Sequence, residues 1–163
     1  MQILKYDQFI SEPVNESAKD EIFRNINKNE ELLINSIYQK KNFCVKTNNP
    51  EIISFAIEEL SKRYNIEVVK VDVDAVDKME NGINEESEFV TEINKNKGKK
   101  HLVLFVGIDK FPENFNNELM PFAKDYKIGE KKIDNIFVGA ICKDEKNVPN
   151  PLIARLGGNM IEM

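Results

Sequence analysis

One uninterrupted apolar run near the middle of the chain most constrains its fold. Six of the seven residues from Leu102 to Ile108 are apolar. A run this short and continuous predicts a strand buried on both faces, as in the interior of a parallel sheet. Asp109 follows, so a carboxylate is expected at the carboxyl edge of the sheet, where open α/β folds place their ligands. The run therefore predicts an α/β fold with a candidate site at that edge.

Strand-like and helix-like segments alternate on both sides of this run. Further strands are expected at 43–47, 66–72, 135–142 and 159–163, and helices at 50–64, 84–94 and 112–126, with a helical turn from 150. The alternation predicts a parallel sheet with helices on both faces, joined by right-handed crossovers. Asn49 and Pro50 indicate a helix start with the Asn as its cap. Pro121 predicts a kink or an early end in the helix at 112–126.

The first forty residues are expected to precede the sheet. Apolar residues at 3–10, ending at Pro13, indicate either a docking arm or a first turn that packs on the core. The apolar spacing from 16 to 40 fits one face of a helix, with a break expected near 27–29. We therefore expect one domain, in which an N-terminal arm and helix over 1–40 pack on an α/β core over 41–163.

Composition narrows the classes of function. The chain has 163 residues and is 41% hydrophobic, which is enough for a single domain with a core. Its net charge of -5 argues against nucleic acid as a partner, and the lysines at 95–100 are interpreted as a solvated loop. No apolar run approaches the roughly 18 residues of a membrane span, and no signal-like segment opens the chain. We expect a cytoplasmic protein without membrane or nucleic-acid partners.

The cysteine and histidine residues do not form a recognisable reactive motif. Cys44 and Cys142 both lie in apolar, strand-like runs, where a free thiol behaves as a small buried hydrophobe. His101 is the only histidine in the sequence and begins a predicted strand. A nucleophile built from these three residues lacks any motif context, and burial would make the thiols inert.

Three aspartates follow the second predicted strand. Asp72, Asp74 and Asp77 lie in the segment Val-Asp-Val-Asp-Ala-Val-Asp. If the strand continued that far, alternation would put Asp72 and Asp74 on the same side, where carboxylate oxygens could hold Mg²⁺. The alternative interpretation is a polar loop that leaves the strand, without a metal.

Several segments in the second half of the chain resemble an AAA+ ATPase domain. Residues 104–111, Leu-Phe-Val-Gly-Ile-Asp-Lys-Phe, are similar to the Walker B strand and its continuation. Residues 136–140, Ile-Phe-Val-Gly-Ala, look like the sensor 1 strand, and 148–156, Val-Pro-Asn-Pro-Leu-Ile-Ala-Arg-Leu, look like the segment that ends in the arginine finger. The resemblance implies a three-layer αβα fold with a five-stranded parallel sheet in the order 5-1-4-3-2. That order also places Cys44 and Cys142 on neighbouring strands.

The phosphate-binding loop of this family has no counterpart here. Its backbone N–H groups can wrap phosphates only where no side chain intrudes, so it is rich in glycine. The matching turn, Lys46 to Glu51, contains no glycine, and the first glycine of the chain is Gly82. Glu51 also places a negative charge at the helix end where a phosphate would bind. We therefore expect no nucleotide cofactor.

The Walker B and sensor 1 segments also depart from the family pattern. In one alignment Gly107 replaces both family acids, and in the other Lys110 takes the place of the catalytic glutamate beside Asp109. Neither alignment leaves a base to orient the attacking water. Cys142 and Lys143 stand where the family carries a polar Asn or Thr. Hydrolysis of ATP by this chain is therefore not expected.

Arg155 matches the arginine finger, which acts on the nucleotide of a neighbouring subunit. The resemblance implies that Arg155 could serve a partner's active site, and the alternative interpretation is a surface or interface salt bridge. The sequence ends eight residues after Arg155, so the helical lid of the family is expected to be missing.

The resulting hypothesis is a non-hydrolysing, degenerate AAA+-like domain without cofactor or metal, which binds proteins or joins an oligomeric assembly. Its candidate partner-facing or vestigial residues are Asp109, Lys110 and Arg155. Two alternatives are an accessory subunit that lends Arg155 to an active ATPase, and a metal-dependent enzyme that uses Asp72, Asp74 and Asp77. The Asn- and Lys-rich composition and the opening residues 3–10 resemble those of tailed-phage proteins, which would make the protein virion-associated.

Overall fold

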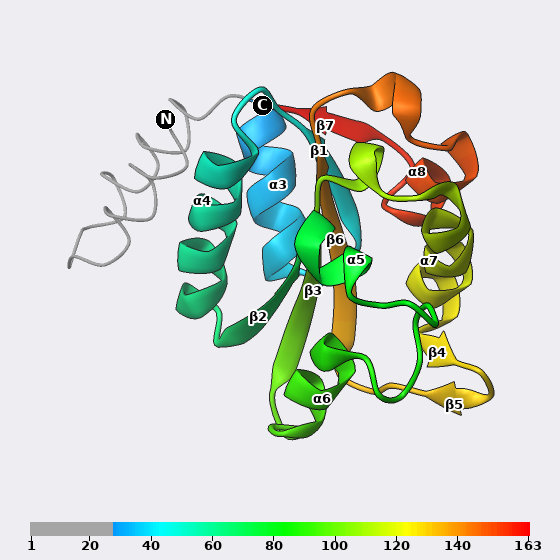
Figure 1. The fold of residues 1–163 in the computed structure, drawn as a ribbon. Helices are drawn as coiled ribbons and strands as arrows, with labels where there is room; N and C mark the ends of the chain where they lie inside the picture. Colours follow the sequence, from blue (N-terminus) through cyan, green and yellow to red (C-terminus); the bar gives the residue numbers. More distant parts are fainter. Residues whose placement is uncertain (1–27) are drawn as a thin grey trace.

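A five-stranded parallel sheet forms the centre of the computed structural model, which describes residues 28–163. The strands are β1 (Phe43–Lys46), β2 (Ile66–Val71), β3 (Lys100–Val106), β6 (Ile136–Cys142) and β7 (Met160–Glu162). They are ordered β2-β3-β6-β1-β7 and every neighbouring pair is parallel (Figure 1). The predicted strand order is therefore confirmed, and with it the three-layer α/β architecture.

Helices cover both faces of this sheet (Figure 1). They are α3 (Lys28–Tyr38), α4 (Pro50–Arg63), α5 (Val73–Asp77), α6 (Glu88–Asn94), α7 (Glu113–Asp125) and α8 (Asn150–Arg155), with 3₁₀ turns η1 (Ile108–Lys110) and η2 (Glu145–Asn147). Helices α3 and α4 lie together on one face, and α6, α7 and α8 lie on the other. None of the described helices is long and apolar enough to cross a membrane.

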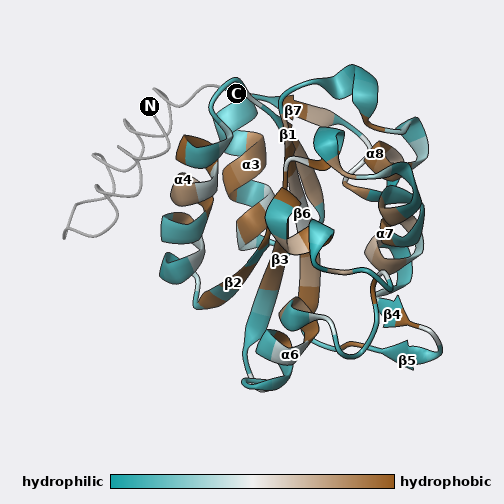
Figure 2. Cartoon of the chain, in the orientation of Figure 1, coloured by the Kyte–Doolittle hydropathy of each residue, from teal (hydrophilic) through white to brown (hydrophobic). Residues whose placement is uncertain are grey.

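The two faces of the sheet carry separate hydrophobic cores, because successive side chains of a strand point to opposite sides. In β3, Leu102 and Leu104 join the core under α3 and α4, whereas Val103 and Phe105 join the core under α6 and α7. All four are fully buried, and each contributes on the order of 1.5–3 kcal/mol through burial. Figure 2 shows hydrophobic colours along β1 and β6 at the centre of the sheet. The apolar run at the middle of the sequence thus anchors both layers.

The central strand ends earlier than the apolar run suggests. β3 ends at Val106, and Gly107 has a φ of 88°, in the left-handed region that glycine adopts readily. The chain then enters η1, where the Ile108 carbonyl accepts a hydrogen bond of 3.1 Å from Asn116 Nδ2. The prediction of a strand to Ile108 was wrong, because a buried turn residue is as apolar as a buried strand residue. Asp109 consequently lies in a turn and not on the strand itself.

Other departures involve local turns. The helix expected at 84–94 begins only at Glu88, and the Asn84 N–H bonds to Ser87 Oγ at 3.0 Å in the preceding turn. An antiparallel pair, β4 (Lys127–Ile128) with β5 (Lys131–Lys132), was not predicted. Helix α7 continues past Pro121 to Asp125, so an early end there was wrong. Pro121 has no N–H, so the carbonyl of Asn117, four residues earlier, lacks its helical hydrogen-bond donor. Both residues are exposed, so water can donate to that carbonyl instead.

The predicted N-terminal arm and most of the predicted N-terminal helix lie outside the described residues. The part of that helix within them is α3, whose buried residues Leu33, Ile34 and Ile37 pack in the core shared with α4. The division of the chain at residue 40 stays a prediction.

Candidate functional site

A cavity of about 540 Å³ opens at the carboxyl edge of the sheet. Its walls come from four segments: the β1–α4 turn with the first residues of α4, the β2–α5 turn, the β3–η1 turn, and Lys143 after β6. This is the edge at which parallel α/β sheets bind ligands. It is also the edge at which the sequence predicts a site, and both Asp109 and Lys110 line it.

The β1–α4 turn is too short and too substituted to wrap a phosphate. Only Thr47, Asn48 and Asn49 separate β1 from α4, and all three carry side chains. The Thr47 N–H donates to the Cys142 carbonyl (2.9 Å), and the Asn49 N–H donates to Thr47 Oγ1 (3.1 Å). Pro50 has no N–H to offer. The Asn49 side chain makes no capping bond, so its predicted role as side-chain cap was wrong.

The charge of the cavity lining is the reverse of what a phosphate requires. The carboxylates of Glu51, Asp72, Asp74 and Asp109 outnumber the ammonium groups of Lys110 and Lys143, so four negative and two positive charges leave a formal charge of -2. The N-terminus of α4 adds about half a positive charge, which offsets only part of the excess. The lining as a whole therefore favours a cation over an anion.

Asp109 has a structural role on one side and an unused acceptor on the other. Its Oδ2 accepts a hydrogen bond of 3.1 Å from the backbone N–H of Asp144, which ties η1 to the turn after β6. Its Oδ1 is shielded from solvent and has no hydrogen-bond partner among the described residues. Lys110 beside it is exposed. Asp109 therefore lines the cavity as a residue, while its unsatisfied oxygen is buried behind the cavity wall.

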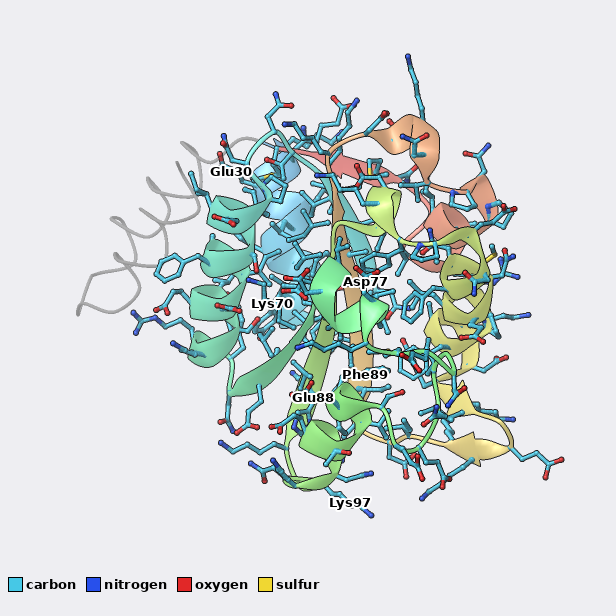
Figure 3. All side chains as sticks on the ribbon, viewed as in Figure 1. Glu30, Lys70, Asp77, Glu88, Phe89 and Lys97 are labelled. Atoms are coloured by element: carbon cyan, nitrogen blue, oxygen red, sulfur yellow. The ribbon has the colours of Figure 1, made fainter. Side chains whose placement is uncertain are left out.

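Of the three aspartates after β2, Asp72 and Asp74 line the cavity and Asp77 does not. Strand β2 ends at Val71, and Asp72 caps α5 by accepting a bond of 2.9 Å from the Ala75 N–H. The condition under which Asp72 and Asp74 would share a strand face is therefore not met, because the strand ends before both residues. Asp77, which Figure 3 labels on α5, is not among the residues that line the cavity. Among residues 28–163, no three His, Cys, Asp or Glu side chains are grouped so that they could hold a metal ion.

Arg155 does not project from its helix as a free side chain. It is the last residue of α8, and its Nη1 donates a bond of 2.9 Å to the Pro151 carbonyl on the same helix. Its Nε is shielded and has no hydrogen-bond partner in the described part of the chain. Arg155 does not line the cavity, so the structure separates it from Asp109 and Lys110.

The remaining titratable candidates are structural. Cys44 and Cys142 are free and buried on the neighbouring strands β1 and β6, as the strand order implies. A hydrogen bond with Cys142, together with burial, raises the pKa of the Cys44 thiol far above its usual range. His101 is the second residue of β3, at the amino edge, where its Nε2 lies 3.4 Å from Glu67 Oε2. The structure therefore does not assemble a cysteine–histidine nucleophile.

Sequence reasoning missed the most heavily bonded polar side chain of the described region. The Asn42 amide donates to the carbonyls of Ala123 (2.8 Å) and Arg155 (3.1 Å). Its oxygen accepts from Tyr126 Oη and from the Val138 N–H, both at 2.8 Å. Asn42 thus joins the ends of α7 and α8 to the sheet at its amino edge. A single Asn before an apolar strand carries no signal of this role, because all four partners are distant in sequence.

The fold has counterparts among solved structures. No family model matches the chain, and no curated protein matches it in sequence. A RuvB mutant from Thermotoga maritima superimposes with a TM-score of 0.58 at 9% identity, over 86% of this chain and 45% of that one. Saccharomyces cerevisiae Rif2 gives 0.57 at 18% identity, over 85% and 54%. NtrX from Brucella abortus, in complex with ATP, gives 0.54 at 14% identity, over 90% and 41%.

The fold is AAA+-like. The chain spans about half the length of these AAA+ neighbours or less. At such low identities the likeness concerns the fold alone, so the chemistry of the AAA+-like domain has to be argued from its own residues.

Proposed function

We propose that this AAA+-like domain neither binds nor hydrolyses ATP and that it acts by binding other proteins. The observation that carries the proposal is the lining of the carboxyl-edge cavity, where four carboxylates face two lysines. In the resemblance drawn from the sequence, this edge is where the nucleotide phosphates would lie.

Two features of the β1–α4 turn act against nucleotide binding. Phosphate recognition relies on several free N–H groups and a lysine that reaches the β- and γ-phosphates. Here the N–H groups of Thr47 and Asn49 are already bonded, and Pro50 has none. Glu51 stands in the first turn of α4, where each contact with a phosphate oxygen would cost on the order of 1 kcal/mol even in a solvated site.

The residues around η1 offer no replacement for the lost catalytic glutamate, which would act as a base. Asp109 is held by the Asp144 N–H, and Lys110, which follows it, cannot accept a proton from an attacking water. The domain would therefore serve an assembly as a rigid body with retained cores on both sides of its sheet.

Calorimetric titration of the chain with ATP–Mg²⁺ and with ADP tests this proposal. We expect no saturable heat at micromolar nucleotide. Stoichiometric binding with a micromolar dissociation constant, or turnover of ATP that follows the folded chain through purification, would contradict it.

An accessory role for Arg155 in a partner's active site is not favoured by the geometry. Such a role requires the guanidinium to extend beyond α8, whereas Nη1 bonds to the Pro151 carbonyl. Replacing Arg155 with alanine should accordingly leave assembly with the protein partner intact, and a lowered ATP turnover of that partner would favour the accessory role.

A further inference from the structure

Two large apolar side chains are exposed on the outer face of α4. Ile52 is 46% exposed and Phe55 is 53% exposed, whereas Ile53, Ala56 and Ile57 on the other side of the helix are at most 2% exposed. Residues three apart are neighbours on a helix surface, so Ile52 and Phe55 form one apolar pair. In the described region such large exposed apolar residues are few, and two of them lie in the first two turns of this helix.

This pair is continuous with the acidic cavity. Ile52 belongs to the cavity lining, next to Glu51 at the start of α4. The carboxylates of Asp72, Asp74 and Asp109 belong to residues of the same lining. An acidic hollow therefore adjoins an apolar ridge on one surface.

From this surface we propose the chemistry of the partner, an inference that rests on the protein-binding function proposed above. The docking surface, defined as the acidic cavity together with Ile52 and Phe55, binds an extended segment of a partner protein that carries a Lys or Arg side chain followed by an apolar one. The basic side chain enters the cavity and donates to the carboxylates, which halves the formal charge of the lining from -2 to -1. The apolar side chain covers Phe55 and removes it from water.

The charge and shape of the surface select this occupant over others. A nucleotide is repelled by the four carboxylates, and a metal ion lacks a three-residue ligand group in the described chain. Neither of these ligands would cover Phe55. A second copy of this chain is the remaining competitor, and it is an outcome of the test.

The test uses an array of short peptides in which Lys, Arg, Asp, Glu, Leu and Phe are placed in pairs in an otherwise Gly–Ser sequence. Binding of the labelled full chain should require a basic residue followed by Leu or Phe, and it should weaken as salt rises because the basic contact is electrostatic. Array peptides with Asp or Glu in place of the basic residue should not bind.

Matched variants locate the contact. Asp74→Asn should weaken binding about two- to fivefold, as expected for a solvated ion pair, whereas Asp77→Asn on the same helix, outside the cavity, should not change it. Asp72→Asn provides a second cavity variant that keeps a capping oxygen for α5. Phe55→Ser should weaken binding about thirtyfold, because the ring is the apolar anchor of the docking surface. Tyr38→Ser, which removes another exposed aromatic residue, should have no effect.

Three outcomes overturn the inference: no array peptide binds, Asp77→Asn acts as strongly as Asp74→Asn, or the chain self-associates and Phe55→Ser makes it monomeric. Competition by ATP–Mg²⁺ would overturn the proposed function as well. Absence of peptide binding together with absence of nucleotide binding would overturn only the peptide inference.

Discussion

The two edges of the sheet are built differently. At the amino edge, Asn42 satisfies four backbone and side-chain groups and joins α7, α8 and β6. At the carboxyl edge, the excess of carboxylates is unmatched and Asp109 Oδ1 lacks a partner in the described chain. Satisfied polar networks stabilise a fold, whereas unmatched charge is tolerated where a site faces a ligand. The comparison indicates that polar groups are satisfied at the amino edge, and it leaves the carboxyl edge as the place where we propose that a partner binds.

The largest effect expected from a polar substitution is at the amino edge. Asn42→Ala should lower the free energy of unfolding by about 3 kcal/mol, because it leaves Tyr126 Oη and the Val138 N–H without their acceptor. Asn48→Ala, at an exposed position in the cavity lining, should change it by less than about 0.5 kcal/mol. Urea unfolding of both variants measures the difference. Equal decreases in the free energy of unfolding for the two variants would contradict the proposed difference between the two edges.

The close contact between Gly139 and Phe43, next to Asn42, should be nearly as sensitive to substitution. Gly139 lies opposite Phe43 in the β1–β6 pairing, and a Cβ at this position would overlap the Phe43 ring. Gly139→Ala should therefore cost about 1–3 kcal/mol by overpacking. Gly98→Ala is the matched control, because a Cβ there meets no neighbouring atom. Thermal unfolding of the two variants should separate them, and similar melting temperatures would show that the Phe43 ring has room to move.

The carboxyl-edge surface should contribute little to stability. Phe55→Ser removes a side chain that is 53% exposed and should change the free energy of unfolding by no more than about 0.5 kcal/mol. Ile57→Ala on the buried side of the same helix should cost about 2–5 kcal/mol. A large decrease in the free energy of unfolding on Phe55→Ser would mean that the ring already packs within the folded chain. Phe55 would then not belong to the docking surface.

The smallest expected effect concerns how the free energy of unfolding changes at acid pH. A hydrogen bond from Lys99, together with the nearby charges of Lys99 and His101, lowers the pKa of Glu67 below its ordinary 4.5. A group whose pKa is lower in the folded state adds stability above its unfolded pKa and loses it as the pH falls through the folded pKa. Glu67→Gln should therefore make unfolding slightly less dependent on pH below about 4.5, as measured by urea titrations at several pH values. An unchanged pH profile would indicate that the exposed pair with Lys99 is fully screened.

The sheet could be predicted from the sequence, because buried parallel strands are short apolar runs. The order of the strands in the sheet followed from the resemblance to AAA+ domains. β3 and β6 illustrate this, since nearly all their residues are buried on both faces. The run could not reveal where β3 stops, because Ile108 in the following turn is as buried as the strand. Only the backbone of Gly107 marks the boundary.

The candidate site was predicted in its location and only partly in its members. Asp109 and Lys110 were found because they follow a recognisable strand, whereas Ile52 and Lys143 enter the cavity through the arrangement of different loops. Asp72 illustrates the opposite error, since a strand pattern was extended into residues that form a capped helix. Asn42 was invisible, because its hydrogen bonds are made entirely to residues far away in the sequence.

The central claim, that the carboxyl edge of this AAA+-like domain does not accept nucleotide, is tested most directly by calorimetric unfolding with and without ATP–Mg²⁺. A ligand bound to the folded state at a hundredfold excess over its dissociation constant adds about 2.7 kcal/mol, which would raise the melting temperature by about 5–10 °C. We predict no change in melting temperature at millimolar ATP–Mg²⁺. A rise of several degrees that saturates with nucleotide would contradict the account.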